Sequence, residues 1–396
     1  MRLRLVLLAL GTFAVGTDAM VVAGILPLLA RDLDVPVAAA GQIVTVFALA
    51  YALLAPLLAT VTARWPRRRL LLTGLVFFTL ANVLTALAPD YPTLLATRVL
   101  AAAGAAMYTP TAVAVATMMA APERRGRALA LVMGGMTVST ALGVPLGTWL
   151  GRTDWRLTMW LVAGLGAAAL AGLATMLPAL PTPKAAPGLR DRLAPLRDRR
   201  VFGAVTTTFL FFVAVQSVYI YTATLVAPAT GGSADRLSLL LFVAGLASVA
   251  GNWLAGRVID RFGARAALVV GGTITALVQC ALPWGSLSMT GMLICNLLGP
   301  LAGWGLNVAL QHRLSSVNPG AAPLLLSLNS SALYLGTAAA GGVGSAAIAV
   351  LGTRWFPLAA AALAALATIL AAVTSRAGRA AAIPAAAPGV VAPAVH

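Results

Sequence analysis

The sequence predicts an all-α integral membrane protein with twelve transmembrane helices arranged as two pseudo-symmetric bundles of six. Three observations support this fold class. Of the 396 residues, 60% are hydrophobic and 9% are charged, whereas a soluble domain carries about 25% charged residues. The apolar residues form twelve runs, each long enough to cross a hydrocarbon core roughly 30 Å thick. The two halves of the chain also share a loop motif, which indicates that each half is one structural unit.

The twelve apolar runs are the predicted spans, and one charged, proline-containing segment divides them into six and six. We expect an N-terminal bundle in residues 1–180, a cytoplasmic central loop in 181–201, a C-terminal bundle in 202–375 and a disordered cytoplasmic tail in 376–396. The spans cover residues 5–29, 37–61, 70–88, 93–119, 128–150, 157–180, 202–226, 237–259, 266–286, 289–311, 322–350 and 357–374.

The placement of basic residues predicts how the chain is oriented in the membrane. Of the 27 Lys and Arg side chains, 21 flank the spans on one predicted side of the bilayer and five on the other. The positive-inside rule places the basic side, with both termini and the central loop, in the cytoplasm. Membrane orientation therefore explains the net charge of +17, and no nucleic-acid partner is expected.

The sequence offers little for enzyme chemistry. It contains no phosphate-binding P-loop, no Ser-His-Asp arrangement and no cluster of metal ligands, so we expect no enzyme activity, cofactor or metal site. Cys280 and Cys295 lie inside apolar runs, where packing is their expected role, and neither His312 nor His396 is near them in the sequence.

Asp18 is the one charge in the first apolar run and lies close to its middle. A carboxylate at that depth costs on the order of 3 kcal/mol unless water, a partner charge or a proton compensates it. These compensations point to transport. The alternative is a signal peptide, because Arg2 and Arg4 precede the run. The run is too long for a signal peptide, however, and it carries an acid and lacks an A-x-A cleavage site.

Arg98, in the fourth span, is the other charge that lies well inside a span. Counting about 1.5 Å per helical residue from the span ends brings Arg98 within about 10 Å of the depth of Asp18. We expect the two side chains to face one cavity and to couple the binding of protons and substrate. The alternative is a static buried ion pair that holds the first and fourth helices together.

An internal repeat relates the two halves. The loop after the second span, RWPRR, matches the loop after the eighth, RFGAR, and a shift of 198 residues places Asp18 on Gln216 and Arg98 on Asn296. Parallel repeats of this kind imply an axis along the membrane normal, with a substrate path between the halves near the midplane. Chance similarity between apolar runs is the alternative.

The tenth span carries a polar stripe, because Asn296, Gly303, Asn307 and Gln311 fall on one helical face that suits a water-filled cavity. A cavity with few charges favours neutral or cationic lipophilic substrates. For the aromatic candidates, packing between helices or against lipid is the alternative. The residues that we expect to line the substrate cavity are Tyr108, Gln216, Tyr219, Asn296, Trp304, Asn307 and Asn329.

Glycines and one proline are concentrated in the fifth span. Small residues let helix backbones approach closely, and a proline removes one backbone hydrogen bond. We therefore expect Gly143, Pro145 and Gly147 to shape a bend in this helix.

The order GVPLG followed by Trp155 and Arg156 resembles the antiporter motif of the major facilitator superfamily, in its twelve-span drug:proton antiporter branch. Gly16–Asp18 with Gly24–Pro27 resembles the first-span signature of bacterial exporters for drugs, arabinose-like sugars and purines. Arg98 stands at the arginine of the family's R-x-x-Q-G motif, although alanines replace its Gln and Gly.

The loop after the eighth span extends the resemblance. It is a full copy of the family motif G-x-x-x-D-R-x-G-x-R, whereas in the first-half copy Ala59, Ala63 and Pro66 replace Gly, Asp and Gly. The resemblance implies a charge latch at a cytoplasmic gate in the second half, and anchoring of basic residues in the anionic leaflet is the alternative. The WPRRR sequence of the first-half loop is similar to actinobacterial chloramphenicol exporters. The gate residues would be Gly256, Asp260, Arg261, Gly263 and Arg265.

The resemblance implies a major facilitator fold in a bacterial cell membrane and alternating-access export of a small lipophilic compound or drug, chloramphenicol-like, in exchange for protons. Drug efflux and antibiotic resistance would follow. The implied partners are a small-molecule substrate, protons and the lipid bilayer, with the chain as a monomer. Two alternatives stay open. One is a sugar or purine exporter or facilitator without proton coupling. The other is a membrane sensor, which usually needs a soluble domain larger than the central loop of about twenty residues.

Overall fold

Nearly all of the described chain is helical. The computed structural model describes residues 2–121, 124–178, 180, 193–318 and 321–380, and these residues contain no strand. The first half contains α1 (Arg2–Asp32), α2 (Val37–Val61), α3 (Arg67–Ala86), α4 (Tyr91–Met119), α5 (Arg125–Val138), the π-helical segment η2 (Ser139–Gly143), α6 (Val144–Leu150) and α7 (Trp155–Met176). The second half contains the 3-10 helix η3 (Ala194–Arg197), α9 (Arg199–Ile220), α10 (Thr222–Leu225), α11 (Ala227–Thr230), α12 (Ala234–Gly285), α13 (Met289–Val317), α14 (Ala322–Trp355) and α15 (Pro357–Ala380).

The twelve predicted spans are confirmed. Eleven helices in the described part of the chain are long and apolar enough to cross a membrane. One of them, α12, has 52 residues and holds two predicted spans, because Gly263 interrupts it with φ 81° and ψ 154°. The fifth span is the continuous run of α5, η2 and α6.

Two boundaries differ from the predicted ones. α9 begins at Arg199, before the expected start of the C-terminal bundle, because the Asp198 carboxylate caps the helix by accepting a hydrogen bond from the backbone N–H of Arg200 (2.8 Å). α15 continues to Ala380, so residues 376–380 of the predicted tail are helical. The rest of that tail, 381–396, and residues 181–192 of the predicted central loop lie outside the described residues.

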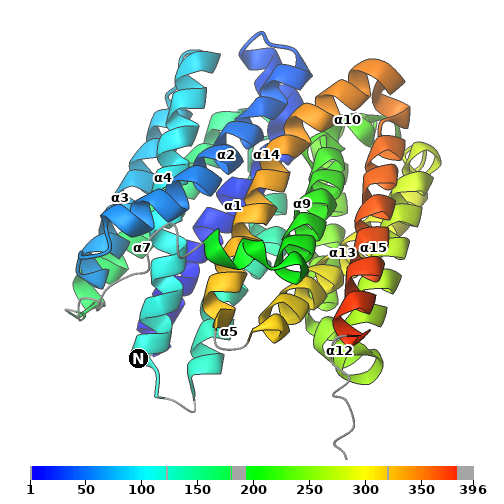
Figure 1. The fold of residues 1–396 in the computed structure, drawn as a ribbon. Helices are drawn as coiled ribbons and strands as arrows, with labels where there is room; N and C mark the ends of the chain where they lie inside the picture. Colours follow the sequence, from blue (N-terminus) through cyan, green and yellow to red (C-terminus); the bar gives the residue numbers. More distant parts are fainter. Residues whose placement is uncertain (1, 122–123, 179, 181–192, 319–320, 381–396) are drawn as a thin grey trace, which may run out of the picture.

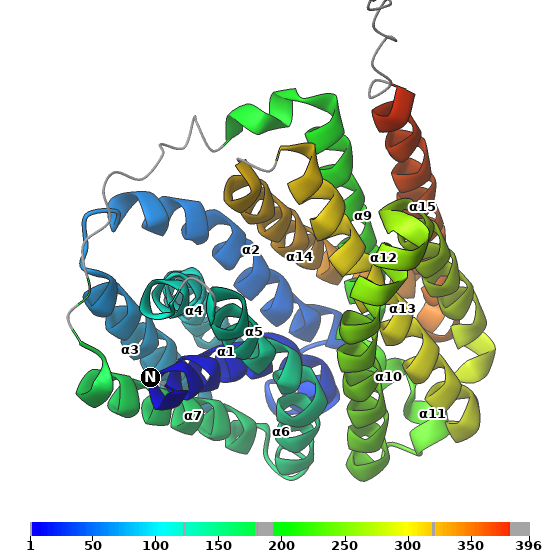
Figure 2. The same ribbon diagram turned by 90° about the horizontal axis from the view of Figure 1, so that it is seen from below.

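The helices form two halves that lie side by side, α1 to α7 in one and α9 to α15 in the other (Figure 1). α2 packs beside α14, and the run of η2 and α6 packs beside α12, so these helices build the interface. Both described ends of the chain lie at the same end of the molecule, which we call the terminal end (Figure 1). Figure 2 views the molecule from this end. We call the opposite end the far end.

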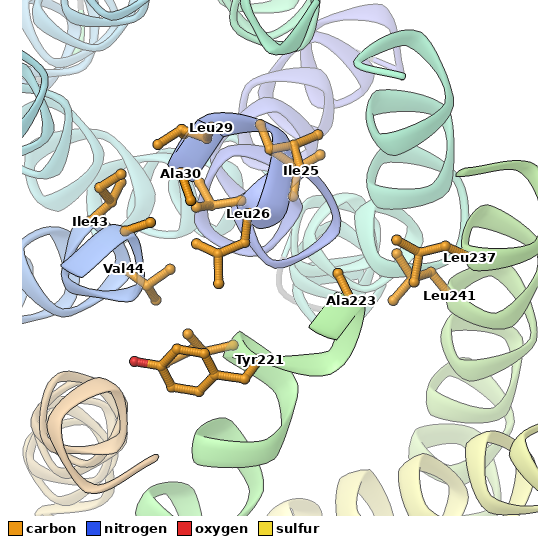
Figure 3. Packing of buried hydrophobic residues seen from close by; sticks show 14 of the residues in the cluster. Ile25, Leu26, Leu29, Ala30, Ile43, Val44, Tyr221, Ala223, Leu237 and Leu241 are labelled. Atoms are coloured by element: carbon orange, nitrogen blue, oxygen red, sulfur yellow. The ribbon is translucent and has the colours of Figure 1, made fainter. Parts of the chain in front are cut away.

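An apolar cluster joins the halves at the far end. Leu26 of α1 and Val44 of α2 lie across from Tyr221 of the second half (Figure 3). All three side chains are buried, and the Tyr221 hydroxyl donates a hydrogen bond to the Gly341 carbonyl (2.8 Å). The far end is therefore closed by packing across both halves.

Toward the terminal end each half has apolar clusters of its own. In the first half, one apolar cluster has buried members from α1 to α7 and the adjoining turns only. In the second half, two apolar clusters have buried members from α9 to α15 only. Between the two ends, Tyr51 of α2 stacks on Tyr334 of α14 with ring centroids 3.8 Å apart. The described apolar contacts between the halves thus run from the far end to the middle of the molecule.

Candidate functional site

Asp18 and Arg98 form a buried ion pair between α1 and α4. Arg98 Nη1 lies 2.8 Å from Asp18 Oδ1, and Nη2 lies 3.1 Å from Oδ2. The Arg98 and Asp18 side chains are 2% and 0% exposed. The guanidinium also lies over the Phe47 ring of α2, 4.7 Å from its centroid. The structure therefore brings the two charges together in a two-pronged contact, the strongest geometry for such a pair.

Small residues bring the fifth span against α1 next to Asp18. A Cβ at Gly143 would contact Thr17, and a Cβ at Gly16 would contact Ser139. The Thr17 hydroxyl is already occupied, because it donates to the Phe13 carbonyl of its own helix (2.8 Å). Larger residues at the two glycines would push the helices apart, so this packing fixes the position of the α1 segment that carries the carboxylate.

The fifth span contains a π-helical turn directly before Pro145. Because proline has no backbone N–H, it cannot close the α-helical hydrogen bond, and the wider turn absorbs this defect. The Val144 N–H bonds to the Ser139 carbonyl, five residues back. Beyond the proline, the Gly147 carbonyl accepts a hydrogen bond from Thr158 of α7 (2.7 Å). A π-helical turn thus stands where the sequence predicts a bend.

A cavity of about 1130 Å³, counting the part that opens to solvent, lies mainly in the second half. Most of its wall comes from α9, α12 and α13, and the first half contributes Met20 and Thr140. None of the described residues that line it is charged. The predicted cavity residues that the structure places in this lining are Gln216, Tyr219, Asn296, Trp304 and Asn307.

Two predicted cavity residues lie elsewhere. Tyr108 is fully buried inside the first half, where its hydroxyl donates to the Leu8 carbonyl (2.8 Å). Asn329 of α14 is also buried, and its Oδ1 accepts a hydrogen bond from the Thr208 hydroxyl of α9 (2.7 Å). Both residues use their polar atoms to join helices, and neither belongs to the cavity lining.

Asp18 and Arg98 also lie outside the lining, because each is turned toward the other inside the first half. The connection to the cavity runs through Met20, two residues further along α1. The Tyr219 hydroxyl donates to the Met20 carbonyl (3.2 Å), and Gln216 Nε2 lies 3.9 Å from the Met20 sulfur. α1 therefore links the ion pair to the second half over about half a helical turn.

Part of the cavity wall has no counterpart among the predicted residues. Thr275 and Gln279, from the ninth span, line the cavity, and so does Ser248 from the eighth. The spacing of Thr275 and Gln279 by four residues puts both polar side chains on one face of an otherwise apolar run. That spacing is the signal from which the sequence could have indicated this wall.

The loop motif of the second half lies where Gly263 separates the two spans of α12. Asp260 and Arg261 are exposed, and within the described part of the chain Asp260 makes no ion pair within 4 Å. In the first half, Pro66 stands in place of the glycine and caps α3 with φ −56°. Proline cannot adopt the positive φ of Gly263, so the two copies turn differently. The remaining predicted gate residues, Gly256 and Arg265, lie on either side of this turn.

The far end carries two ion pairs that the sequence did not indicate. Asp32, at the end of α1, accepts hydrogen bonds from Trp155 (2.9 Å) and Arg156 of α7. These bonds hold the pKa of Asp32 below its ordinary value. Arg152 Nη1 lies 3.3 Å from Asp235 Oδ1, so this exposed pair joins the two halves.

Comparison with known families finds a match to the Major Facilitator Superfamily over residues 8–316. The chain belongs to the Major Facilitator Superfamily. Within this family, the inner membrane transport protein YdhP of Escherichia coli strain K12 is 30% identical to it over 94% of this chain and 96% of that protein. A chloramphenicol resistance protein of Streptomyces lividans is 36% identical over 68% of this chain and 70% of that protein.

A solved structure agrees with the major facilitator fold. The crystal structure of a bacterial homologue of the human lysosomal transporter Spinster, in an inward-facing and unoccupied conformation, matches with a TM-score of 0.76 at 16% identity, covering 94% of this chain and 96% of that one. This major facilitator protein is therefore a multi-pass membrane transporter with bacterial relatives, and its family implies a small-molecule substrate and a lipid bilayer around it.

Proposed function

We propose that this chain exports a small lipophilic compound in exchange for protons, by alternating access to the cavity that the second half forms with Met20 and Thr140 of the first half. The observation that carries the proposal is the buried pair of Asp18 and Arg98, two residues along α1 from the cavity-lining Met20. A carboxylate inside a bilayer is costly and is a functional site by default. Here it lies on α1, one of the first-half helices that contact the second half.

Protonation of Asp18 removes the charge that holds Arg98. The two hydrogen bonds of the pair then weaken, and α1 gains freedom to shift against α4. Because the Met20 carbonyl accepts a hydrogen bond from Tyr219 of α9, such a shift changes a contact between the halves. A proton biases a conformational equilibrium only if Asp18 binds it with different affinity in the two states. On this proposal the affinity differs because the Asp18–Arg98 pair is formed in one state and broken in the other.

The cavity lining supports a neutral or cationic lipophilic substrate, because it is mostly apolar with a few amides and hydroxyls and no described charge. Chloramphenicol is the first candidate, since one relative is named a chloramphenicol resistance protein. On this proposal the protein contributes to drug efflux and antibiotic resistance. One chain suffices as the functional unit, because the ion pair and the cavity wall come from a single chain.

We further propose that both termini lie in the cytoplasm, because most Lys and Arg residues flank the terminal ends of the spans. The structure then corresponds to an inward-facing state, in which Asp260 has no ion-pair partner among the described residues. When the halves close on the cytoplasmic side, Asp260, Arg261 and Arg265 come within reach of neighbouring helices and act as the latch. The first-half loop lacks the carboxylate for this role, because Ala63 replaces it.

Uptake into everted membrane vesicles tests the coupling. With an imposed pH gradient, the wild type should accumulate labelled chloramphenicol, and Asp18→Asn should reduce this uptake about tenfold or more, because the amide cannot exchange a proton. The matched control is Asp32→Asn, which removes a carboxylate from the far end of the same helix and should leave the uptake within about twofold. Chloramphenicol uptake by Asp18→Asn at the wild-type level under the pH gradient would exclude a coupling role for Asp18.

A sugar or purine facilitator without proton coupling is the second candidate. It is favoured by the completeness of the ion pair, since both Asp18 oxygens bond Arg98 and neither residue lines the cavity. A static ion pair that only holds α1 against α4 would have the same geometry. Substrate-induced alkalinisation separates the two candidates, because only an antiporter moves protons as substrate enters. A facilitator would equilibrate labelled substrate without a pH gradient and would retain this activity in Asp18→Asn.

A further inference from the structure

Another hollow lies on the outside of the first half, along the first turns of α3. Its volume is about 900 Å³, counting the part that opens to solvent. α3 packs beside α7 and lies at the edge of the first half that is remote from the second half (Figure 2), so the hollow faces the lipid. We call it the α3 groove. The residues that line it are Pro66, Arg68, Arg69, Leu72, Thr73, Val76, Phe77 and Leu180.

The wall of the groove changes from basic to apolar along α3. Arg68 and Arg69 lie at the start of the helix. Leu72, Val76 and Phe77 follow over the next two turns. From Arg69 to Phe77 the helix rises about 12 Å, which is close to the depth of one leaflet, about half of a hydrocarbon core roughly 30 Å thick. The groove therefore presents charge at the membrane surface and an apolar track below it, which is the pattern of a phospholipid.

Arg68 is held at the mouth of the groove by the end of α7. Its Nε donates a hydrogen bond to the Leu177 carbonyl (2.8 Å), and its Nη2 donates to the Ala174 carbonyl (2.7 Å). Both carbonyls belong to the end of α7, where the helix itself offers no donor to them. The two bonds fix the guanidinium, and they leave Nη1 without an acceptor among the described residues.

The positive charge at the mouth has no counter-charge in the described part of the chain. Arg69 is exposed and lies over the Trp65 ring, 4.8 Å from its centroid. Neither Arg68 nor Arg69 has a described carboxylate within 4 Å, and no described residue of the lining is acidic. The helix dipole also disfavours cations in the first turn of α3. An anion at the mouth would therefore be stabilised.

We propose that the α3 groove binds an anionic phospholipid. The phosphate accepts hydrogen bonds from Arg68 and Arg69, whose planar guanidinium groups suit phosphate oxygens. One acyl chain lies along the apolar wall of Leu72 and Val76. A headgroup with a choline or ethanolamine cation fits less well, because no described residue of the lining offers it a carboxylate. This site goes beyond the proposed transport and does not depend on it.

Native mass spectrometry of the purified full chain tests the site, because each bound lipid is resolved by its mass. The probe is dioleoylphosphatidylglycerol, and the comparison is dioleoylphosphatidylcholine, which has the same acyl chains and a cationic group on its phosphate. The first phosphatidylglycerol should bind about tenfold more tightly, or more, than the first phosphatidylcholine. Glycerophosphoglycerol, the same headgroup without acyl chains, should bind more weakly than the lipid by about tenfold or more. Equal affinities for the two lipids, or headgroup binding as tight as that of the whole lipid, would overturn the proposal.

Substitutions locate the lipid. Arg69→Gln should weaken binding of the first phosphatidylglycerol about fivefold and leave phosphatidylcholine binding unchanged, because one arginine beside an anionic headgroup accounts for about that factor. Val76→Trp narrows the apolar track and should weaken binding of both lipids. The matched control is Arg257→Gln, since Arg257 is also exposed and lies over a tryptophan ring, that of Trp253 (3.7 Å), but belongs to α12.

The control variant should keep its phosphatidylglycerol affinity within about twofold of the wild type. Thermal unfolding midpoints close to that of the wild type would show that the variants are folded. Wild-type phosphatidylglycerol affinity in Arg69→Gln or in Val76→Trp would overturn the proposal. An equal loss in Arg257→Gln would also overturn it, because the lipid would then respond to the overall charge of the protein and not to the groove.

Discussion

Gly263 is the residue of the second-half loop motif whose backbone conformation restricts substitution. Its φ of 81° is one that L side chains rarely adopt, although no heavy atom lies within 4 Å of the position that a Cβ would occupy. Gly263→Ala should therefore destabilise the protein by about 1 kcal/mol through backbone strain alone. Gly256→Ala is the control, because that glycine has equal space and lies in an unbroken helical stretch. Equal shifts of both variants in thermal unfolding would contradict the strain account.

Single residues show where sequence reasoning works and where it stops. The pairing of Asp18 with Arg98 could be anticipated, because two lone charges at similar depth in apolar spans gain most from each other. The placement of Tyr108 and Asn329 could not, because residue type does not say which way a helix is rotated. Rotation about the helix axis is set by packing against neighbours, and here it directs both side chains into helix contacts.

The close packing of the fifth span on α1 is a property of the two elements together. A Cβ at Gly143 would collide with Thr17, whereas a Cβ at Gly134 of the same span would meet nothing within 4 Å. Gly143→Ala should therefore destabilise the protein by about 1–3 kcal/mol through overpacking. Gly134→Ala should be neutral or slightly stabilising, because alanine favours a helix. Thermal unfolding of both variants is the measurement. A Gly143→Ala variant as stable as the wild type would show that α1 can move away from the new methyl group at little cost in free energy.

At the scale of elements, hydropathy predicted the spans and missed their internal geometry. Length and apolar composition are enough to locate each span, because the bilayer thickness fixes how many residues a helix needs. Pro145 lacks the backbone N–H that an α-helical hydrogen bond needs, and the helix accommodates this loss in the π-helical turn of residues 139–143. Hydropathy does not say where along the helix that turn forms. The contacts around this turn come from α1, which is more than a hundred residues away in the sequence, and from α7, the next helix.

For the whole molecule, the internal repeat predicted two halves, but it could not predict at which end they meet. One sequence must support closure at either end if access alternates, and the two states differ by only a few kcal/mol. The far-end cluster around Leu26 and Tyr221 shows that the halves meet at the far end in this structure (Figure 3).

A disulfide across the far end would test whether the two halves must part there during transport. A Cβ at Gly341 of α14 would lie 3.4 Å from the Cβ of Thr45 of α2, close to the separation that a disulfide needs. In a background with Cys280 and Cys295 replaced by Ala, Thr45→Cys combined with Gly341→Cys should cross-link on oxidation. Chloramphenicol uptake into vesicles should then stop, because the far end cannot open, and dithiothreitol should restore it. Each single variant should be insensitive to the oxidant, and full uptake by the cross-linked protein would contradict alternating access.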